Sequence, residues 1–456
     1  MRSSVNLARL SLETATAPAN LYCTSDQLQL AAKATSALSP QTWPFSLEWL
    51  PPATYLVGGN VRDALLGRYA DYLDLDFVLP ERAVETAKAI ANHYRAGFVL
   101  LDAERQIARV VFERTTADFA QQVGPTLEDD LRRRDFTVNA IAYNPHTEQL
   151  IDPLHGYQDL QQHLIRMVAP ENLKEDPLRL LRAYRQAAQL EFALEPKTRA
   201  TIQQLANLLK TIAPERVQAE LNYLLNSPRG TPFLSLAVQD ELLVDWLPHA
   251  TSGGLQLMER LDAAAIALKE RWPAFGVLLT DWIKEQPKNT GICPTWFKIA
   301  RLASLVAPDL AIAEQELWHL KYSRAEVQAV VGVLRRLPLV ADLLRPEATR
   351  KDHYLFFKAA GASFPAIAVL AVATGISLEA IAPLVVRYLT PNDPVAHPPP
   401  LLTGNDLMKA LQLKAGPQIG QLLEAIQLAQ AEGKVETPSE AIAFAQQLLS
   451  LKEESL

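Results

Sequence analysis

Hydrophobic positions repeat at two different spacings along this chain, and the change between them divides it into two parts. From Thr54 to about Pro170, apolar runs of strand type are separated by short amphipathic stretches of helical type. Strands are predicted at 55–57, 75–79, 97–101 and 107–112, and helices at 61–66 and 83–96. This part of the chain is therefore predicted to form an α/β head.

Beyond Asn172 nearly every segment has helical periodicity. Helices are predicted at 177–190, 196–209 and 214–225, followed by a succession that reaches Tyr388. Several of them open with proline in the first turn, where the missing N–H costs no hydrogen bond. A stiff proline-rich linker at 391–400 leads into a small helical unit at 401–456. The fold class predicted for the whole chain is α+β, with helices only after the head.

Composition is that of an ordinary globular protein, with 456 residues, 49% hydrophobic and 21% charged, and this length predicts several folded units. The longest apolar segments, around 364–376 and 381–386, are short or interrupted, so no membrane span is expected. Two cysteines, Cys23 and Cys293, cannot form a disulfide framework, which favours a cytoplasmic location. The N-terminus has too little apolar sequence for a secretory signal, and an organelle-targeting role stays open.

The formal net charge of -7 argues against indiscriminate binding to nucleic acid, because generic affinity for phosphates comes from surplus lysine and arginine. Local clusters can still supply that affinity. Two arginine clusters stand out: Arg132, Arg133 and Arg134, and Arg179, Arg182 and Arg185.

Asp74 and Asp76 lie one residue apart in a predicted strand, downstream of a Gly58-Gly59 turn. Alternate strand side chains share a face, so both carboxylates point one way while the intervening Leu75 enters the core. Magnesium is commonly held by one or two carboxylates together with substrate phosphates, which a glycine turn lets the backbone approach. The turn has neither the dinucleotide-binding nor the P-loop pattern. The alternative is a solvated edge strand or turn, because two aspartates at this spacing are common.

A second candidate site follows at 128–140, where Arg134, Asp135 and Asn139 are expected to place donors and acceptors near one helical surface. Triphosphate and ribose could both be bound there. The alternative is a solvated helix start, in which the acidic residues 128–130 pair with the arginines that follow them.

A third candidate site is the pair Asp176 and Arg179, which are expected to be neighbours on a helix. Cytosine and adenine each offer an amino donor beside a ring-nitrogen acceptor, whereas uracil and guanine offer the reverse. A carboxylate acceptor beside a guanidinium donor therefore suits cytosine and adenine. Steps of three residues drift by roughly 60° on a helix, so Arg185 is expected to point away from Asp176. The alternative is an aspartate favoured by the helix dipole, with solvated arginines after it.

At these segments the sequence resembles the class II tRNA nucleotidyltransferase and bacterial poly(A) polymerase family. The similarity covers about Tyr55 to Leu225, and 402–407 with 416–420 are similar to the family's tail segment. Five motifs occur in the family's order: Gly58–Asp63 with Asp74 and Asp76, Arg133–Ala140, Asp152–Leu160, Glu175–Arg179 and Glu215–Val217.

The resemblance implies an enzyme that lengthens the 3' end of tRNA from CTP and ATP without a nucleic-acid template and releases pyrophosphate. It implies a polymerase-beta-like head with a mixed sheet, and no stable protein partner is predicted. The expected divisions are an extension at 1–50, the head at 51–170, a neck at 171–235, a body at 236–390 and a tRNA-binding tail at 391–456.

The resemblance also implies roles for single residues. Asp74 and Asp76 would hold two magnesium ions, and Asp118 is a candidate for a further carboxylate. Glu215 and Arg216 would brace the neck helix. The residues implied to bind the nucleotide are Gly58, Gly59, Arg62, Arg134, Asp135, Asn139, Asp176, Arg179, Arg182 and Arg185.

The sequence departs from the family in one place. Full CCA-adding members carry a flexible arginine-containing loop after the strand equivalent to 117–120, whereas here only 121–126 precede the next predicted helix. CC-adding members lack this loop, so addition of two cytidines is expected, because an absent loop cannot reshape the pocket from C to A. A poly(A) polymerase and a catalytically idle RNA-binding protein are the alternatives. Asp74 and Asp76 argue against idleness, since only a metal makes such like charges tolerable.

Overall fold

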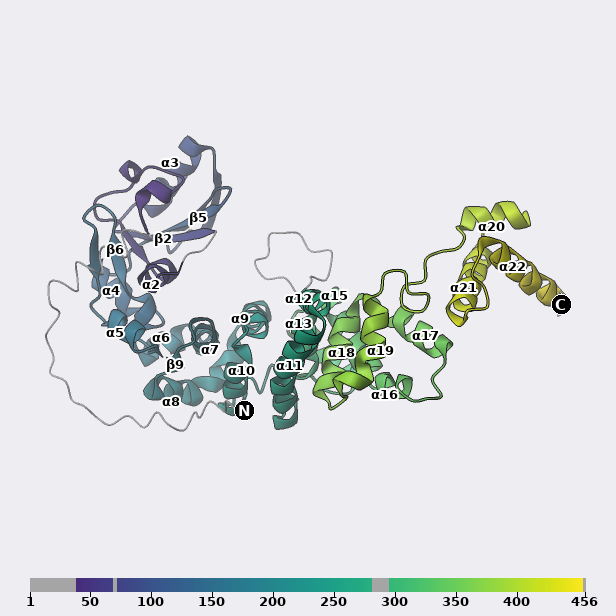
Figure 1. The fold of residues 1–456 in the computed structure, drawn as a ribbon. Coiled ribbons are helices and arrows are strands. Elements are labelled where there is room, and N and C mark those ends of the chain that lie inside the picture. The colour runs from purple at the N-terminus through teal and green to yellow at the C-terminus, as the bar shows by residue number, and fades with distance from the viewer. Residues whose placement is uncertain (1–37, 69–71, 281–294, 454–456) are drawn as a thin grey trace. The chain divides into compact units, whose positions relative to one another are not determined.

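The computed structural model describes residues 38–68, 72–280 and 295–453 (Figure 1). Both cysteines and residues 1–37 of the predicted extension lie outside the described residues. The described chain forms two compact units. The head unit comprises residues up to 162 together with 166–169, and the helical unit comprises 163–165 and everything from 170 onward.

A seven-stranded sheet forms the head unit, in the order β3-β4-β5-β2-β1-β6-β7. Strands β2 and β5 run parallel and all other neighbours run antiparallel, which confirms the predicted mixed sheet. The sequence prediction missed the two short strands β6 and β7. The strands are β1 (Tyr55–Val57), β2 (Leu73–Leu79), β3 (Gly97–Asp102), β4 (Ile107–Val111), β5 (Thr115–Gln121), β6 (Ala142–Asn144) and β7 (Gln149–Ile151).

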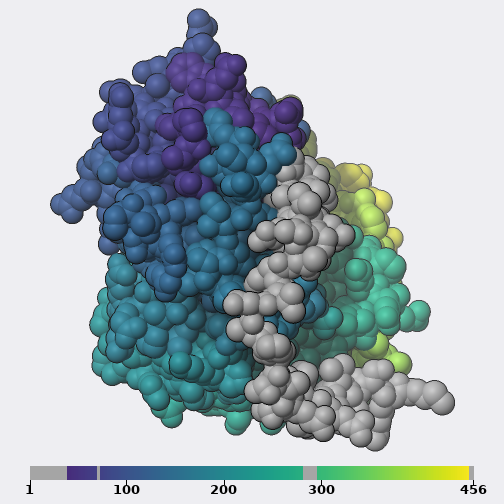
Figure 2. All heavy atoms as spheres, turned by 90° about the vertical axis from the view of Figure 1, so that its left-hand side faces the viewer, coloured from purple at the N-terminus to yellow at the C-terminus, as the bar shows by residue number. Residues whose placement is uncertain are grey.

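Aromatic side chains fill one face of this sheet. Phe77 of β2 stacks on Phe119 of β5 with ring centroids 5.1 Å apart. Trp43 and Phe45, from the start of the described chain, pack against Phe77 at 5.2 and 5.9 Å. Figure 2 shows these first residues, in purple, seated against later parts of the head unit in blue. Residues 38–50 therefore contribute to the head core, which leaves the opposite face of β2 available for polar groups.

Short helices connect the strands of the head. Helix α2 follows β1 directly, and α3 packs on β4 and β5. The helices are α2 (Gly59–Leu65), α3 (Ala83–Tyr94), α4 (Leu127–Arg132), α5 (Gly156–Gln161) and the 3-10 turn η4 (Thr137–Asn139).

The helical unit begins with a two-stranded parallel ladder of β8 (Leu164–Ile165) and β9 (Ala193–Leu194) and is otherwise helical, as predicted. Its first helices are α6 (Pro170–Glu175), α7 (Leu178–Leu190), α8 (Pro196–Leu205), α9 (Pro214–Asn226) and α10 (Gly230–Gln239). The next are α11 (Ser252–Arg271), α12 (Pro273–Thr280), α13 (Trp296–Ala303), α14 (Leu310–His319), α15 (Arg324–Arg336), α16 (Leu339–Leu343), α17 (Arg350–Ala360), α18 (Phe364–Ala373) and α19 (Leu378–Leu389).

One helical segment, Arg350–Ala373, is long and apolar enough to cross a membrane by length and composition. This corrects the expectation that no apolar run reaches that length. Pro365 stands in the first turn of α18, where a helix accepts proline, so it does not end the run. Of the apolar window, 67% is buried inside the protein, and the core helix of a globular protein passes the same test.

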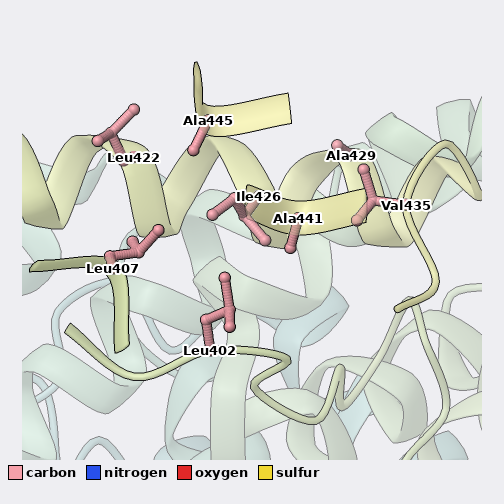
Figure 3. Close-up of a cluster of buried hydrophobic side chains, with 8 residues drawn as sticks. All are labelled: Leu402, Leu407, Leu422, Ile426, Ala429, Val435, Ala441 and Ala445. Carbon is pink, nitrogen blue, oxygen red and sulfur yellow. The ribbon is translucent and has the colours of Figure 1, made fainter. Parts of the chain in front are cut away.

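The last three helices share a small apolar core of their own. They are α20 (Gly404–Leu411), α21 (Pro417–Glu432) and α22 (Pro438–Glu453). Figure 3 shows Leu407, Leu422 and Ile426 in this cluster, and Leu402 from the preceding segment reaches it as well. This cluster is the structural counterpart of the small helical unit predicted after the proline-rich linker.

Candidate active site

The turn between β1 and α2 places backbone beside two charged side chains. Gly58 has φ +78° and ψ -143°, a conformation that side chains other than glycine rarely adopt. A Cβ built on Gly58 would lie 3.2 Å from Asp76 Oδ2 and 3.8 Å from Arg134 Nη1. The glycine thus brings the chain close to a carboxylate and a guanidinium at the same point.

Strand β2 presents its two aspartates on one face, as the alternation predicts. Asp74 is exposed and Asp76 half-buried, whereas Leu75 and Phe77 are each 1% exposed. The Asp74 carboxylate accepts a hydrogen bond from the Thr116 hydroxyl on β5, and its main-chain carbonyl accepts one from the Asn60 side chain. Asp74 is therefore held from both neighbouring elements.

Charged residues continue across the sheet from Asp76. Its register partner on β5 is Asp118, whose partner on β4 is Arg109. Arg109 donates from Nε and Nη2 to the two Asp118 oxygens at 2.6 and 2.7 Å. This paired hydrogen bond raises the pKa of Arg109 above its ordinary value. Asp118, the candidate further carboxylate, lies next to Asp76 and forms an ion pair with Arg109.

Burial, together with the charges of Asp74 and Asp118, raises the pKa of Asp76 to about 7, against the opposing effect of Arg134 and Arg109. A bound cation would relieve this concentration of negative charge, and the donors are all oxygen, which suits magnesium. Among the residues that the structure describes, no group of three His, Cys, Asp or Glu side chains could hold a metal. The two aspartates therefore fit a metal that takes its remaining ligands from substrate and water, rather than a closed protein cage.

A hydrogen-bonded chain connects α2 to the Arg-Arg-Asp motif. Arg62 donates to the Asp63 carboxylate at 2.9 and 3.0 Å and to Asn139 Oδ1 at 2.8 Å. Asn139 in turn donates to Asp135 Oδ1 at 2.9 Å. Three of the residues implied to bind the nucleotide, Arg62, Asp135 and Asn139, thus form one network.

The expectation that Arg134, Asp135 and Asn139 share one helical surface is wrong. Helix α4 ends at Arg132, and Asn139 lies in the separate 3-10 turn η4. Asp135 and Asn139 are joined by the hydrogen bond described above and not by a common helix. The alternative salt bridges are present as well. Arg134 pairs with Asp130 at 3.1 Å, and Arg132 pairs with Glu128.

In the helical unit, Asp176 and Arg179 do not lie on one helix, which contradicts the prediction. Asp176 lies between α6 and α7, before the first residue of α7. Its Oδ2 accepts from Arg216 Nη2 at 2.9 Å, whereas Arg179 Nη1 donates to the carbonyl of Asn172, also at 2.9 Å. The Arg179 amide donates to the carbonyl of Asp176 at 2.9 Å, so the two stay adjacent through the backbone.

The remaining two arginines lie further along α7. Arg182 is half-buried. Arg185 pairs with Glu220 of α9 at 2.6 Å, and its guanidinium lies 5.1 Å from the Tyr223 ring centre. Arg185 is thus directed at the middle of α9, the helix whose first turn holds Asp176 through Arg216. That Arg185 points away from Asp176 stays a prediction.

Sequence reasoning missed the groups that orient the proposed site residues: Asn60, Asp63, Arg109 and Thr116. A signal for one of them was present, because Thr116 and Asp118 alternate on β5 as Asp74 and Asp76 do on β2. The pairing of Arg109 with Asp118 depends on the strand order, and the hydrogen bond from Asn60 to Asp74 depends on the turn after β1. Periodicity reveals neither.

Family models match three segments of the chain: the Poly A polymerase head domain at residues 54–166, the "Probable RNA and SrmB-binding site of polymerase A" at 191–253 and tRNA nucleotidyltransferase domain 2 at 296–445. Among solved structures, a complex of a CCA-adding enzyme with ATP is similar, with a TM-score of 0.67 and 22% identity, covering 87% of this chain and 91% of that one. At this identity the likeness shows the fold.

Curated relatives found by sequence have higher identity to this chain. The chain is 49% identical to a CC-adding tRNA nucleotidyltransferase of Synechocystis sp., over 90% of this chain and 96% of the relative. It is 34% identical to an A-adding tRNA nucleotidyltransferase of Deinococcus radiodurans, over 87% of this chain and 95% of the relative. With similarity of this extent along nearly its whole length, the chain belongs to the tRNA nucleotidyltransferase and poly(A) polymerase family.

Proposed function

We propose that this chain is a template-independent tRNA nucleotidyltransferase that transfers CMP from CTP to the 3' end of tRNA and releases pyrophosphate. The observation that carries the proposal is the pair Asp74 and Asp76 beside the Gly58 turn, with the pKa of Asp76 raised to about 7 by burial and by the like charges around it. A cytoplasmic site of action stays a prediction.

In this proposal Asp74 and Asp76 would hold Mg²⁺. The bound metal would lower the pKa of the primer 3' hydroxyl and neutralise the triphosphate and the leaving pyrophosphate. Thr116 and Asn60 keep Asp74 in place for that task. Arg134, which lies beside the Gly58 turn, would hold phosphate or ribose oxygens where the glycine backbone can approach them.

Selection of the base is assigned to the helical unit. Asp176 would accept a hydrogen bond from the amino group of cytosine, and Arg179 would donate to the ring nitrogen beside it. The ion pair with Arg216 at 2.9 Å supports this role, because it limits the directions in which the Asp176 carboxylate can point. Arg216 is thus a positioning residue and not a contact to the base.

Two additions, rather than three, are proposed for each tRNA. Strand β5 ends at Gln121 and α4 begins at Leu127, so five residues, 122–126, stand where full CCA-adding members carry a flexible loop. The 49% identical relative is named as CC-adding. The A-adding name of another relative means that family membership alone does not fix which nucleotide is added.

A poly(A) polymerase is the second candidate, because the matched head-domain model carries that description. Product length separates the two functions. A polymerase would give long and uneven tails on general RNA, whereas the proposed enzyme gives a fixed short extension of tRNA.

The proposal is tested with tRNA that lacks its CCA end, incubated with CTP and Mg²⁺. We expect incorporation by the natural chain and none by Asp74→Ala or Asp76→Ala. Glu104→Ala is the matched control, since it removes an exposed carboxylate from the turn between β3 and β4 of the same unit. Incorporation by either aspartate variant at the rate of the control would exclude the proposed metal site.

A further inference from the structure

A fully buried arginine stands in the helical unit, remote in sequence from every motif discussed above. Arg301 of α13 is 1% exposed. Its Nη2 and Nε donate to Asp262 Oδ1 on α11 at 2.7 and 3.2 Å, and its guanidinium lies 4.4 Å from the ring centre of Phe297. Burying a guanidinium is costly unless it is paired and its donors are satisfied, so this position has a specific requirement for arginine.

The remaining donors of Arg301 reach the end of helix α9. Nη1 donates to the carbonyl of Leu225 at 2.7 Å and to that of Ser227 at 2.8 Å. The last carbonyls of a helix have no partner within it and carry partial negative charge, so a buried cation fixes them in place. The chain then turns back closely, because a Cβ on Gly230 would lie 1.8 Å from the carbonyl oxygen of Leu224.

Helix α9 carries the groups that hold the proposed base-reading segment. Near its start Arg216 pairs with Asp176 at 2.9 Å, and in its middle Glu220 pairs with Arg185 at 2.6 Å. A helix of 13 residues is a rod about 20 Å long, so its far end moves when its near end is displaced or turned. The position of the C-terminal end of α9 therefore controls where Arg216 holds the Asp176 carboxylate.

We infer that Arg301 is a positioning residue for nucleotide selection, acting through α9 on Arg216 and Asp176. This inference rests on the proposed function and deepens it. Arg301 does not touch the nucleotide. It anchors the helix whose other end sets the direction of the base-reading carboxylate.

The test compares kcat/KM for CTP with kcat/KM for UTP on tRNA lacking its CCA end. Arg301→Lys keeps the buried charge next to Asp262. It replaces the planar five-donor guanidinium with a compact three-donor ammonium, which does not reproduce the fork that spans Asp262 and the two carbonyls. We expect the ratio of kcat/KM for CTP to that for UTP to fall roughly tenfold or more in this variant, because small displacements of a binding group by remote residues have effects of at least this size. Val369→Ala is the matched control, because it destabilises the same unit from the fully buried face of α18.

Asp262→Asn provides a second variant if Arg301→Lys does not fold. It should also lower the preference for CTP. The inference is overturned if the preference for CTP is unchanged in these variants. It is also overturned if the preference changes no more than in a Val369→Ala protein that has lost as much in melting temperature. Asp176→Asn separates this failure from failure of the proposed function. If Asp176→Asn relaxes selection and the Arg301 variant does not, Asp176 reads the base without control by Arg301. If neither variant changes selection, the base-reading role itself is wrong.

Discussion

At the scale of single residues, the chemistry of the head site depends on neighbours that look unremarkable in the sequence. Asp76 carries a raised pKa because it is buried next to Asp74 and Asp118. Gly58 has no side chain and so lets the backbone approach the Asp76 carboxylate closely, and Thr116 orients Asp74. Each of these contributions can be removed separately.

Gly58→Ala should reduce CMP transfer at least about tenfold, because its Cβ would press on Asp76 Oδ2 at 3.2 Å and shift that carboxylate. Gly67→Ala is its control. Gly67 also has positive φ, at +67°, but a Cβ there meets nothing within 4 Å. Both substitutions place an alanine at positive φ, which costs about 1 to 3 kcal/mol of backbone strain. Equal activity of the two variants would show that strain, and not the contact with Asp76, is the cause.

Thr116→Val keeps the shape of the side chain and removes the hydroxyl that donates to Asp74. We expect a loss of activity of about five- to tenfold, since one hydrogen bond to a charged group is removed. Thr116→Ser restores the hydroxyl and should recover most of the rate. A serine variant as slow as the valine variant would contradict the proposed orienting role.

At the scale of elements, periodicity predicted β1 to β4 and many of the helices, whereas β5 was expected only through the resemblance and the turns were predicted poorly. Leu75 and Phe77 alternate with Asp74 and Asp76, so the face of β2 that bears the carboxylates could be predicted. Strands β6 (Ala142–Asn144) and β7 (Gln149–Ile151) are as short as β1, but each includes a polar residue, so neither forms the apolar run that revealed β1. Between Arg133 and Asn139 the chain leaves the helix, and only tertiary hydrogen bonds determine that path.

The junction of α7, α8 and α10 makes a pH-dependent contribution to stability. Burial acts to raise the pKa of Asp240, but hydrogen bonds from Arg199, Tyr184 and Gln203 outweigh it and hold that pKa below its usual range. Because the pKa is lower in the folded state, the stabilisation is complete above the unfolded-state value of about 3.9 and is lost as the pH falls through the folded-state value.

Asp240→Asn should therefore lower the free energy of unfolding by about 1 to 3 kcal/mol at pH 7. Urea unfolding of both proteins between pH 3 and 8 measures the difference. It should be constant from about pH 5 upward and shrink below about pH 4. A difference that grows on acidification would mean that the Asp240 carboxylate is not stabilised in its charged form.

At the scale of the whole molecule, the motifs recognised in the sequence cover the head, the start of the helical unit and parts of the tail, whereas the body between them was predicted only as helix packing. Arg301 illustrates why single residues of the body could not be assigned a role from the sequence. It occupies no recognisable motif, and its importance appears only when α9, α11 and α13 are assembled around it. The tail likewise has its own apolar core, shown in Figure 3, and the sequence did not predict which residues form it.

The predicted tRNA-binding role of the tail can be tested by ending the chain after Thr390. The exposed ion pair of Lys358 with Glu424 contributes little, but the truncation also removes the buried Val395 and the partner of Arg387, Asp393. The melting temperature of the shortened chain is therefore measured first, to show that it folds. We expect KM for tRNA to rise roughly tenfold or more while KM for CTP changes little. Unchanged affinity for tRNA would remove the tail from the binding surface.

The central claim is that this metal site adds two cytidines to tRNA and then stops. The most direct measurement uses tRNA lacking CCA with Mg²⁺ and CTP alone, ATP alone, or both, and counts the added nucleotides on a sequencing gel. We predict two added residues with CTP whether or not ATP is present, and none with ATP alone. A third nucleotide that appears only when ATP is supplied with CTP would contradict the claim and identify a full CCA-adding enzyme.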